Sequence, residues 1–337
     1  MDWSIQNLPS LSLMGLILVS FLFLAKGADW LVQEAVALSV RWGIPKSIIG
    51  ATIISLGTTL PETTVSSMAA LQGNSDMALG NAIGSIICNA GLILGLASWI
   101  TPLPVDQNTI RWQQRVQLGS AAFLILACLP WHALSTTFIS GGRLSKSMGL
   151  IFLGLTAAYL WLSFRKKRGS QEAWAPQEFR SERGLSDFLV VVKLAFAIGM
   201  VVGSSRLIIP AVSEVAVRLG VPDGIVAATM VAFGTSLPEL VTAVTSAMKG
   251  HGEIGLGNVM GANILNALLV TGAAAAIADN GLSVPPYFFR VLFPAMLLVL
   301  GVLNRGISAS NDNFSRTYGG WLLGIYIAVT TASYILL

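Results

Sequence analysis

The chain has 337 residues, of which 54% are hydrophobic and only 11% are charged, and its formal net charge is +4. An average soluble domain carries about 25% charged residues, so this composition excludes a soluble catalytic domain and predicts an integral membrane protein that is not an enzyme. The basic residues lie between apolar stretches, where they act as topology signals, so no nucleic-acid partner is expected.

Ten apolar stretches are long enough to cross a lipid bilayer, which takes about 20 residues per helix. They cover residues 11–38, 44–71, 77–99, 113–131, 147–164, 186–217, 222–248, 254–277, 288–304 and 319–337. The expected fold class is therefore all-α, with ten transmembrane helices. No basic residue precedes the first stretch, as a signal peptide would require, so the first helix is expected to be retained.

The distribution of Lys and Arg predicts the orientation of these helices. With the N-terminus outside, thirteen basic residues of the connecting segments fall on the inner side and four on the outer side. Basic residues are enriched in cytoplasmic loops, so we predict a multi-pass protein of the inner (plasma) membrane with both termini outside.

Residues 42–95 align without a gap to residues 219–272, at a constant offset of 177. Each half holds five spans, an odd number, so the second half must enter the membrane from the opposite side. We therefore predict two inverted-topology five-helix repeats, residues 1–164 and 185–337, joined by a cytoplasmic linker at 165–184. In transporters built this way the substrate site lies near the midplane, where the repeats meet.

Each repeat carries a proline-glutamate motif in the middle of a span. The first reads Ser55-Leu56-Gly57-Thr58-Thr59-Leu60-Pro61-Glu62, and the second reads Ala232-Phe233-Gly234-Thr235-Ser236-Leu237-Pro238-Glu239. Proline has no N–H and clashes with the carbonyl four residues back, so each motif should break its helix and free carbonyl oxygens. The glutamate and the threonine four positions before it should project on the same side of the break.

A polar stripe follows in the next span of each half. Asn81, Ser85 and Asn89 recur at helical spacing, and the equivalent positions hold Asn258, Ala262 and Asn266. With the glutamate motifs, these segments offer carboxylate, hydroxyl, amide and carbonyl oxygens and no sulfur or imidazole, a set that suits a hard cation such as calcium.

A charged side chain inside the membrane indicates a functional role or an ion pair, because inserting a charge at the centre of a membrane helix costs roughly 2.5–3.5 kcal/mol. For Glu62 and Glu239 we favour a shared ion site over a purely structural role. Asp29 and Arg206 occupy equivalent repeat positions, and we predict that they form an ion pair between the first and sixth spans. Cys88 and Cys128 lie in apolar stretches and indicate no disulfide or metal site.

The paired Gly-Thr-(Ser/Thr)-Leu-Pro-Glu motifs, each followed by Gly-Asn-x-x-Gly-(Ser/Ala)-x-Ile-x-Asn, resemble the alpha repeats of the calcium/cation antiporter superfamily, and most closely those of the small bacterial and archaeal sodium/calcium exchangers. The resemblance covers essentially the whole chain. It implies a central calcium site formed by Glu62, Glu239, Thr58 and Thr235. It implies flanking sodium sites formed by Thr59, Ser85 and the Ser55 carbonyl on one side, and by Ser236 and the Ala232 carbonyl on the other.

The sequence departs from the family pattern at two positions. Ala262 stands where a serine is often found, and Asn266 stands where some relatives carry an aspartate. With Asn89 at the equivalent position, only two carboxylates remain, and neither stoichiometry nor electrogenicity follows from the sequence. The linker is too short for the calcium-sensing domains of animal exchangers.

The expected function is antiport of calcium against sodium by alternating access, without a cofactor. A proton/calcium exchanger is an alternative, because closely spaced buried carboxylates bind protons readily, and potassium co-transport is a further one. A cation channel is a remote alternative, since it would need a symmetric filter. An intramembrane hydrolase would need a His-Glu-x-x-His or serine–base arrangement, which the two histidines do not supply.

Overall fold

The computed structural model describes residues 7–165, 187–219, 234–310 and 312–336. The predicted linker at 165–184 lies outside the described residues except for Arg165, as does the first part of the span predicted at 222–248. The helices of the first half are α2 (Ser10–Trp42), α3 (Lys46–Ile49), α4 (Ser55–Thr58), α5 (Leu60–Leu71), α6 (Ser75–Cys88), α7 (Leu94–Ile100), α8 (Gln107–Cys128), α9 (Thr137–Ser140) and α10 (Lys146–Arg165). Those of the second half are α11 (Asp187–Arg218), α13 (Leu237–Met248), α14 (Gly252–Leu265), α15 (Thr271–Ile277), α16 (Phe293–Ala309) and α17 (Arg316–Leu336).

Short non-α segments interrupt several of these helices. The π-helical segments are η1 (Gly50–Ile54), η2 (Asn89–Ile93), η5 (Asn266–Val270) and η6 (Phe288–Leu292), and η3 (Leu134–Thr136) is a 3₁₀ turn. In lipid every backbone polar group must be satisfied within the protein, which favours helices throughout. Within the described residues, six helices are long and apolar enough to cross a membrane, so the count of ten spans remains a prediction.

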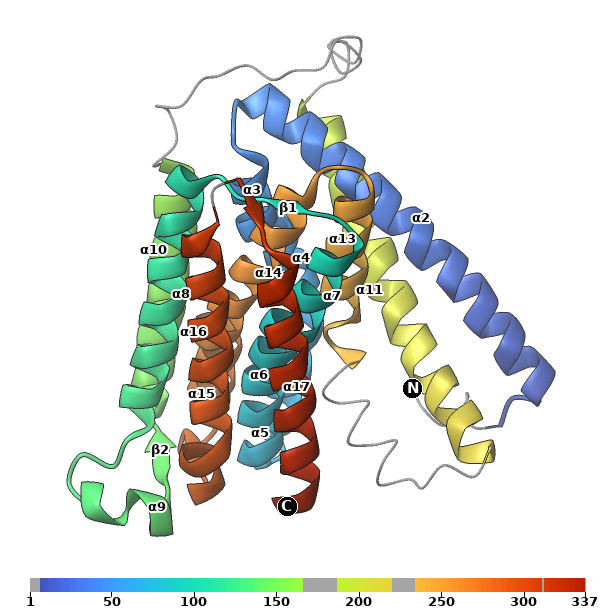
Figure 1. Cartoon of the computed structure of the whole chain (residues 1–337). Helices are drawn as coiled ribbons and strands as arrows, with labels where there is room; N and C mark the ends of the chain where they lie inside the picture. The colour runs from blue at the N-terminus through green and yellow to red at the C-terminus, as the bar shows by residue number, and fades with distance from the viewer. Residues whose placement is uncertain (1–6, 166–186, 220–233, 311, 337) are drawn as a thin grey trace.

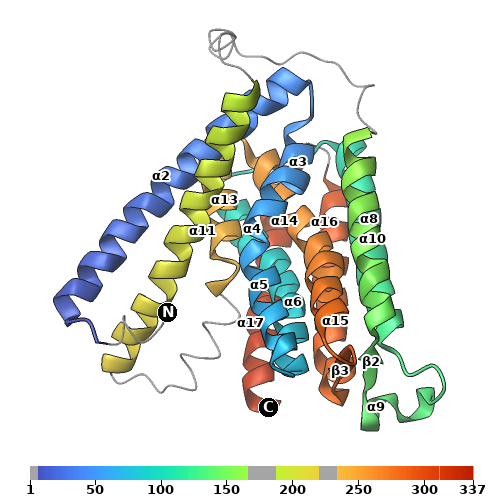
Figure 2. The same ribbon diagram turned by 180° about the vertical axis from the view of Figure 1, so that it is seen from behind.

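The internal repeat is visible in the element boundaries. The segments α5, α6, η2 and α7 recur 177 residues later as α13, α14, η5 and α15. The long helices α2 and α11 also correspond, and they lie side by side at one edge of the bundle, running in opposite directions (Figures 1 and 2). Equivalent helices that run oppositely are what an inverted repeat requires.

The predicted Asp29–Arg206 ion pair is wrong. Gly27 of α2 packs against Met200 and Val201 of the antiparallel α11, so the two predicted partners lie several residues apart along the pair. Asp29 instead pairs with Lys249, whose Nζ lies 3.0 Å from its Oδ1. This contact connects α2 to the segment between α13 and α14.

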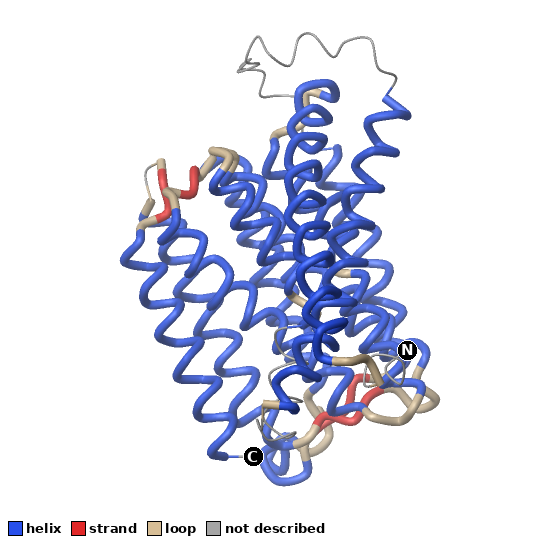
Figure 3. The backbone as a smooth tube through the Cα atoms, turned by 90° about the vertical axis from the view of Figure 1, so that its right-hand side faces the viewer, coloured by secondary structure: helices blue, strands red, loops and turns tan. Residues whose placement is uncertain are grey.

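Two short antiparallel ribbons add strands to the expected all-α fold. One pairs β1 (Leu103–Pro104) with β4 (Asn313–Phe314), and the other pairs β2 (Gly142–Leu144) with β3 (Leu282–Val284). They lie at opposite ends of the helices, and each connects the first half of the chain to the second (Figure 3).

The helix α14 lies at the centre of the bundle and packs directly on the backbone of the first repeat. A Cβ added to Gly257 would lie 2.2 Å from the Ser47 backbone oxygen, and one added to Gly261 would lie 2.3 Å from that of Ala51. Glycine is therefore required at both positions, because close helix contact leaves no room for a side chain.

A cluster of charged and polar side chains lies at the N-terminal end of α14. Lys46 Nζ lies 3.0 Å from Glu253 Oε1 and 3.1 Å from His251 Nδ1. Partial burial, and then the charge of Lys46, lower the pKa of His251 from its usual value, while Glu253 acts in the opposite sense. The folded protein thus favours neutral His251.

We expect Gly257→Ala to destabilise the protein by ~1–3 kcal/mol, the usual range for overpacking, because the backbone oxygen of Ser47 cannot rotate away. The measurement is the melting temperature of the detergent-solubilised protein. Gly301→Ala is the matched control, since no neighbouring described atom lies within 4 Å of its new Cβ, and it should leave the melting temperature unchanged or higher. Equal melting temperatures for the two variants would contradict the tight contact.

Acidification should expose the role of His251. Its folded pKa is lower than its unfolded pKa, so as pH falls through about 6.5 the unfolded chain takes up a proton before the folded protein does, and stability decreases. We expect His251→Gln to show a smaller loss of melting temperature between neutral pH and pH 5.5 than the wild type. His132→Gln, which changes the other, exposed histidine, is the matched control.

Candidate functional site

Two glutamates lie at the starts of helices that begin inside the bundle. The proline motif ends α4 at Thr58, and α5 begins at Leu60 with Glu62 in its first turn. In the second repeat α13 begins at Leu237 with Glu239 in its first turn. The positive end of a helix dipole stabilises a carboxylate in the first turn, so both breaks place an acidic group where the local field tolerates it.

Both glutamate side chains are completely buried, at 0% exposure, and their carboxylates are close enough to repel each other. Thr58 lies near Glu239, and Thr235 lies near Glu62, so each carboxylate has a threonine of the opposite repeat beside it. The hydroxyl of Ser236 donates a hydrogen bond of 3.4 Å to Glu62 Oε1. The structure therefore brings the two predicted glutamates into one site.

Reciprocal hydrogen bonds connect the two repeats around this site. Thr58 Oγ1 donates to Asn258 Oδ1 at 3.3 Å, and Thr235 Oγ1 donates to Asn81 Oδ1 at 3.2 Å. The two bonds are equivalent under the offset of 177. The threonine at each helix break is thus held by an asparagine from the other half of the chain.

The asparagines do not have the same surroundings. The Nδ2 of Asn81 donates to the Glu62 backbone oxygen at 3.3 Å and to Ser66 Oγ at 3.0 Å. Ala243 stands at the position equivalent to Ser66, and the Nδ2 of Asn258 has no hydrogen-bond partner among the described residues. The first repeat therefore fixes its asparagine more firmly than the second.

Several oxygens at the site accept no hydrogen bond from the residues that the structure describes. They are Glu62 Oε2, both carboxylate oxygens of Glu239 and Thr59 Oγ1. Buried polar atoms nearly always have a partner, and an unpaired buried carboxylate is especially costly. A cation held between the carboxylates would satisfy them.

The structure bears on the remaining predicted ligands to different extents. Ser85 Oγ lies 3.5 Å from Thr235 Oγ1, which places it at the site. The Ser55 carbonyl already accepts a hydrogen bond of 2.9 Å from the Thr59 N–H. Ala232 lies outside the described residues.

Asn89 and Asn266 are fully buried, and each begins a π-helical turn. Their side-chain amides have no hydrogen-bond partner among the described residues. Isolated π turns inside α-helices are frequent at functional sites. The sequence pointed to both asparagines but did not predict the π turns that they begin. The recurrence of both asparagines at the repeat offset was the only available signal.

Four other buried residues of these helices were assigned no role from the sequence. Asn81 and Asn258 were seen as part of a polar stripe but were not assigned a role, although their repeat equivalence could have indicated one. Thr242 has no polar equivalent in the first repeat, and Cys88, within electrostatic reach of both glutamates, gave no sequence signal at all.

The donor set consists of two carboxylates with hydroxyl and amide oxygens. Among the described residues, no group of three or more His, Cys, Asp or Glu side chains could hold a metal ion. A site with few charges and many neutral oxygens suits a hard cation that is bound and released rather than a tightly held transition metal.

Comparisons with known proteins agree with this chemistry. The family described as "Sodium/calcium exchanger protein" matches residues 12–165 and 189–335. The chain is 33% identical over 291 residues to the inner membrane protein YrbG of Escherichia coli, covering 84% of this chain and 85% of that protein. It is 27% identical to the sodium/calcium exchanger MaX1 of Methanosarcina acetivorans, covering 93% and 96%. A solved structure of the sodium-calcium exchanger NCX_Mj superposes with a TM-score of 0.77 at 27% identity, covering 96% of this chain and 99% of that one.

We expect Thr58→Val to destabilise the protein by ~1–3 kcal/mol, because it keeps the side-chain shape but leaves Asn258 Oδ1 buried without its donor. Thr64→Val is the control, since it removes an exposed hydroxyl that bonds only to the Leu60 carbonyl of its own helix. The thermal stabilities of Thr58→Val, Asn258→Leu and the double variant should be non-additive. Strict additivity would mean that the two side chains do not interact.

Proposed function

Because the chain belongs to the sodium/calcium exchanger protein family, we propose that it exchanges calcium for sodium across the membrane at one central site formed by Glu62 and Glu239. Cation exchange follows from the family, and the central site is supported chiefly by one observation. Two buried carboxylates from opposite repeats lie within repulsive reach, and three of their four oxygens have no hydrogen-bond partner among the described residues.

In this proposal calcium is bound by the two glutamates and by the threonines at the helix breaks, Thr58 and Thr235. The reciprocal bonds to Asn258 and Asn81 hold these threonines in place. Calcium takes six to eight oxygens in flexible geometry, which such a mixed set can supply.

Sodium would occupy the flanks of the same site. One flank would use Thr59, Ser85 and the Ser55 carbonyl, and the other would use Ser236 and the Ala232 carbonyl. Asn89 and Asn266 would add amide oxygens. Ala262 offers no hydroxyl where the first repeat has Ser85, so the two flanks are chemically unequal.

Coupling follows from the electrostatics of the two carboxylates. Without a cation the site would hold two like charges in a medium of low dielectric constant, a state much less stable than the loaded one. Only the loaded carrier would therefore switch its site readily from one side of the membrane to the other. This requirement produces exchange rather than one-way flux.

The movement itself would involve α2 and α11 sliding against the remaining helices. These two long helices pack mainly on each other, at the edge of the bundle (Figure 1). They contribute none of the proposed ligands, so their displacement would change access without dismantling the site.

The proposed topology has ten spans in two inverted halves, 1–164 and 185–337, with a cytoplasmic linker at 165–184. Both termini would lie outside the inner membrane. The recurrence of element boundaries, the antiparallel pair α2–α11 and the excess of basic residues on one side support this arrangement.

A proton/calcium exchanger is the second candidate, because two neighbouring buried carboxylates can bind a proton in place of a metal ion. A potassium-dependent exchanger would use the same centre. A cation channel is the remote candidate, and it would not need a site that two opposed half-helices close.

We expect Glu62→Gln and Glu239→Gln each to lower sodium-dependent calcium uptake into proteoliposomes by at least ~100-fold, since even outer-shell changes at metal sites cost 10–100-fold. Asp76→Asn is the matched control, because Asp76 also lies in the first turn of a helix but is exposed, and it should transport normally. Size-exclusion profiles and melting temperatures would establish that all three variants fold. Wild-type calcium flux in either glutamine variant would refute the proposed site.

The counter-ion can be identified with wild-type proteoliposomes under separate sodium, potassium and proton gradients. We expect an outward sodium gradient at fixed pH to drive uptake of radioactive calcium, and a proton gradient alone to drive little, because the flanks carry neutral oxygens suited to sodium. Uptake driven by protons without sodium would favour the second candidate. Calcium conductance above carrier rates in a planar bilayer would favour the channel.

A further inference from the structure

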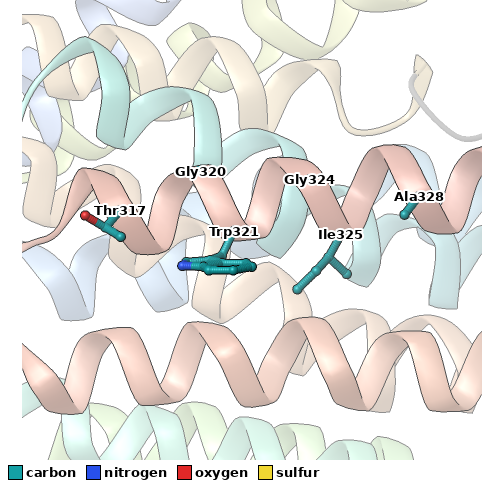
Figure 4. Close-up of a pocket in the computed structure, with 6 residues that line it drawn as sticks. All are labelled: Thr317, Gly320, Trp321, Gly324, Ile325 and Ala328. Atoms are coloured by element: carbon teal, nitrogen blue, oxygen red, sulfur yellow. The ribbon is translucent and has the colours of Figure 1, made fainter.

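Two apolar grooves open on the outside of the helical bundle. The larger, of about 600 Å³, follows one face of α17 and is lined by Thr317, Gly320, Trp321, Gly324, Ile325 and Ala328 (Figure 4). None of its lining residues is charged. The smaller groove, of about 280 Å³, lies between α8, α9 and α16, and its lining residues are likewise uncharged.

The walls of the smaller groove are almost entirely apolar. Its lining includes Ile125 of α8, Phe138 of α9, and Phe293 and Leu297 of α16. Thr137 is the one polar residue in the lining, and its hydroxyl is already bonded to the Leu134 carbonyl. The groove therefore suits a hydrocarbon chain and offers no buried polar group to a soluble ligand.

Arg290 lies at the end of this groove. It lies in the π-helical segment η6, directly after Phe289, which is a residue of the lining. Its guanidinium donates a hydrogen bond to the carbonyl of Phe138, a residue of the opposite wall. Arg290 is exposed, and a guanidinium has five N–H donors in a planar fork that matches a phosphate.

The surrounding segment has the character of a membrane interface. Trp131, Leu134, Phe138 and Ile139 are exposed and apolar, and they lie in the short connection between α8 and β2. The indole N–H of Trp131 is satisfied by the Leu126 carbonyl. Aromatic and apolar side chains beside a basic residue are typical of the level of the lipid headgroups. This connection lies at one end of the helices (Figures 1 and 2).

We propose that the groove between α8, α9 and α16 binds an anionic phospholipid, with one acyl chain against Phe293 and Leu297 and the phosphate on Arg290. Both parts of the lipid have a counterpart in the groove: the apolar walls suit the acyl chain, and the guanidinium of Arg290 suits the phosphate of the headgroup. Such a lipid would fasten α9 and its exposed apolar side chains to α16. It would act on the stability of this corner and not on the ion site, so the inference is independent of the proposed function.

The test uses the purified full chain in detergent, with native mass spectrometry to count bound lipid and thermal unfolding to measure its effect. The probes are phosphatidylglycerol, phosphatidylcholine with the same chains, and inorganic phosphate. We expect phosphatidylglycerol to be retained most strongly and to raise the melting temperature most. Phosphatidylcholine should do so more weakly because its headgroup has no net charge, and phosphate should have no effect because it lacks the chain.

Arg290→Gln should retain phosphatidylglycerol roughly tenfold more weakly, as expected for loss of a charge-assisted contact. Arg305→Gln is the matched control, since it removes the same charge from the exposed surface near the other end of α16 and should bind as the wild type does. Should Arg290→Gln fail to fold, Leu297→Trp fills the groove while keeping the arginine, and it should also prevent retention.

Three results would overturn the proposal. The first is equal retention of phosphatidylglycerol by wild type, Arg290→Gln and Leu297→Trp. The second is equal stabilisation by inorganic phosphate, which would indicate a simple anion contact. The third is a change from monomer to dimer that depends on Leu297, which would mean that a second copy of the chain covers the groove.

Discussion

Repulsion between two buried carboxylates is the constraint on which the arrangement of this protein depends. Glu62 and Glu239 have no solvent exposure, and each charge would cost roughly 2.5–3.5 kcal/mol at the centre of a membrane helix even without a like charge beside it. The fold lowers this cost by breaking the helices one turn earlier, which gives each glutamate the positive end of a helix dipole. What remains is offset by a cation in the proposed mechanism, and the same imbalance makes the empty carrier unfavourable.

A rigid frame is needed to keep these two groups at a fixed separation. The threonine–asparagine bonds cross from one repeat to the other, and the contacts of Gly257 and Gly261 bring α14 onto the backbone of α3 and η1. Such contacts cannot relax gradually, because close-packed backbones either fit or clash. The helices that carry the proposed ligands are therefore held together as one unit, while α2 and α11 pack mainly on each other at its edge.

The pair contacts the unit through apolar side chains such as Ile49, Ile54 and Ile254, which share a core cluster with α2 and α11, and also through an ion pair. Lys249 reaches Asp29 of α2 from the segment between α13 and α14, and Lys193 of α11 contacts Glu34 of α2 within the pair itself. An ion pair at a partly exposed position contributes little free energy, usually below about 1 kcal/mol. The Lys249–Asp29 contact can thus orient α2 without locking it, as sliding of α2 and α11 would require.

The sequence alone determined the features that depend on local chemistry. Apolar stretches marked where helices lie, and Pro61 and Pro238 marked where two of them break, because hydrophobicity and a missing N–H act within a few residues. The offset of 177 identified equivalent residues and led to Glu62 and Glu239 as a pair. Tertiary structure decided the partners: Asp29 meets Lys249 and not Arg206, and Thr58 meets Asn258, 200 positions away. The π turns at Asn89 and Asn266 and the two strand ribbons also appeared only in the fold. These features depend on which distant atoms come within about 3 Å of each other, and helical periodicity specifies the face of a helix but not the residue that packs against it.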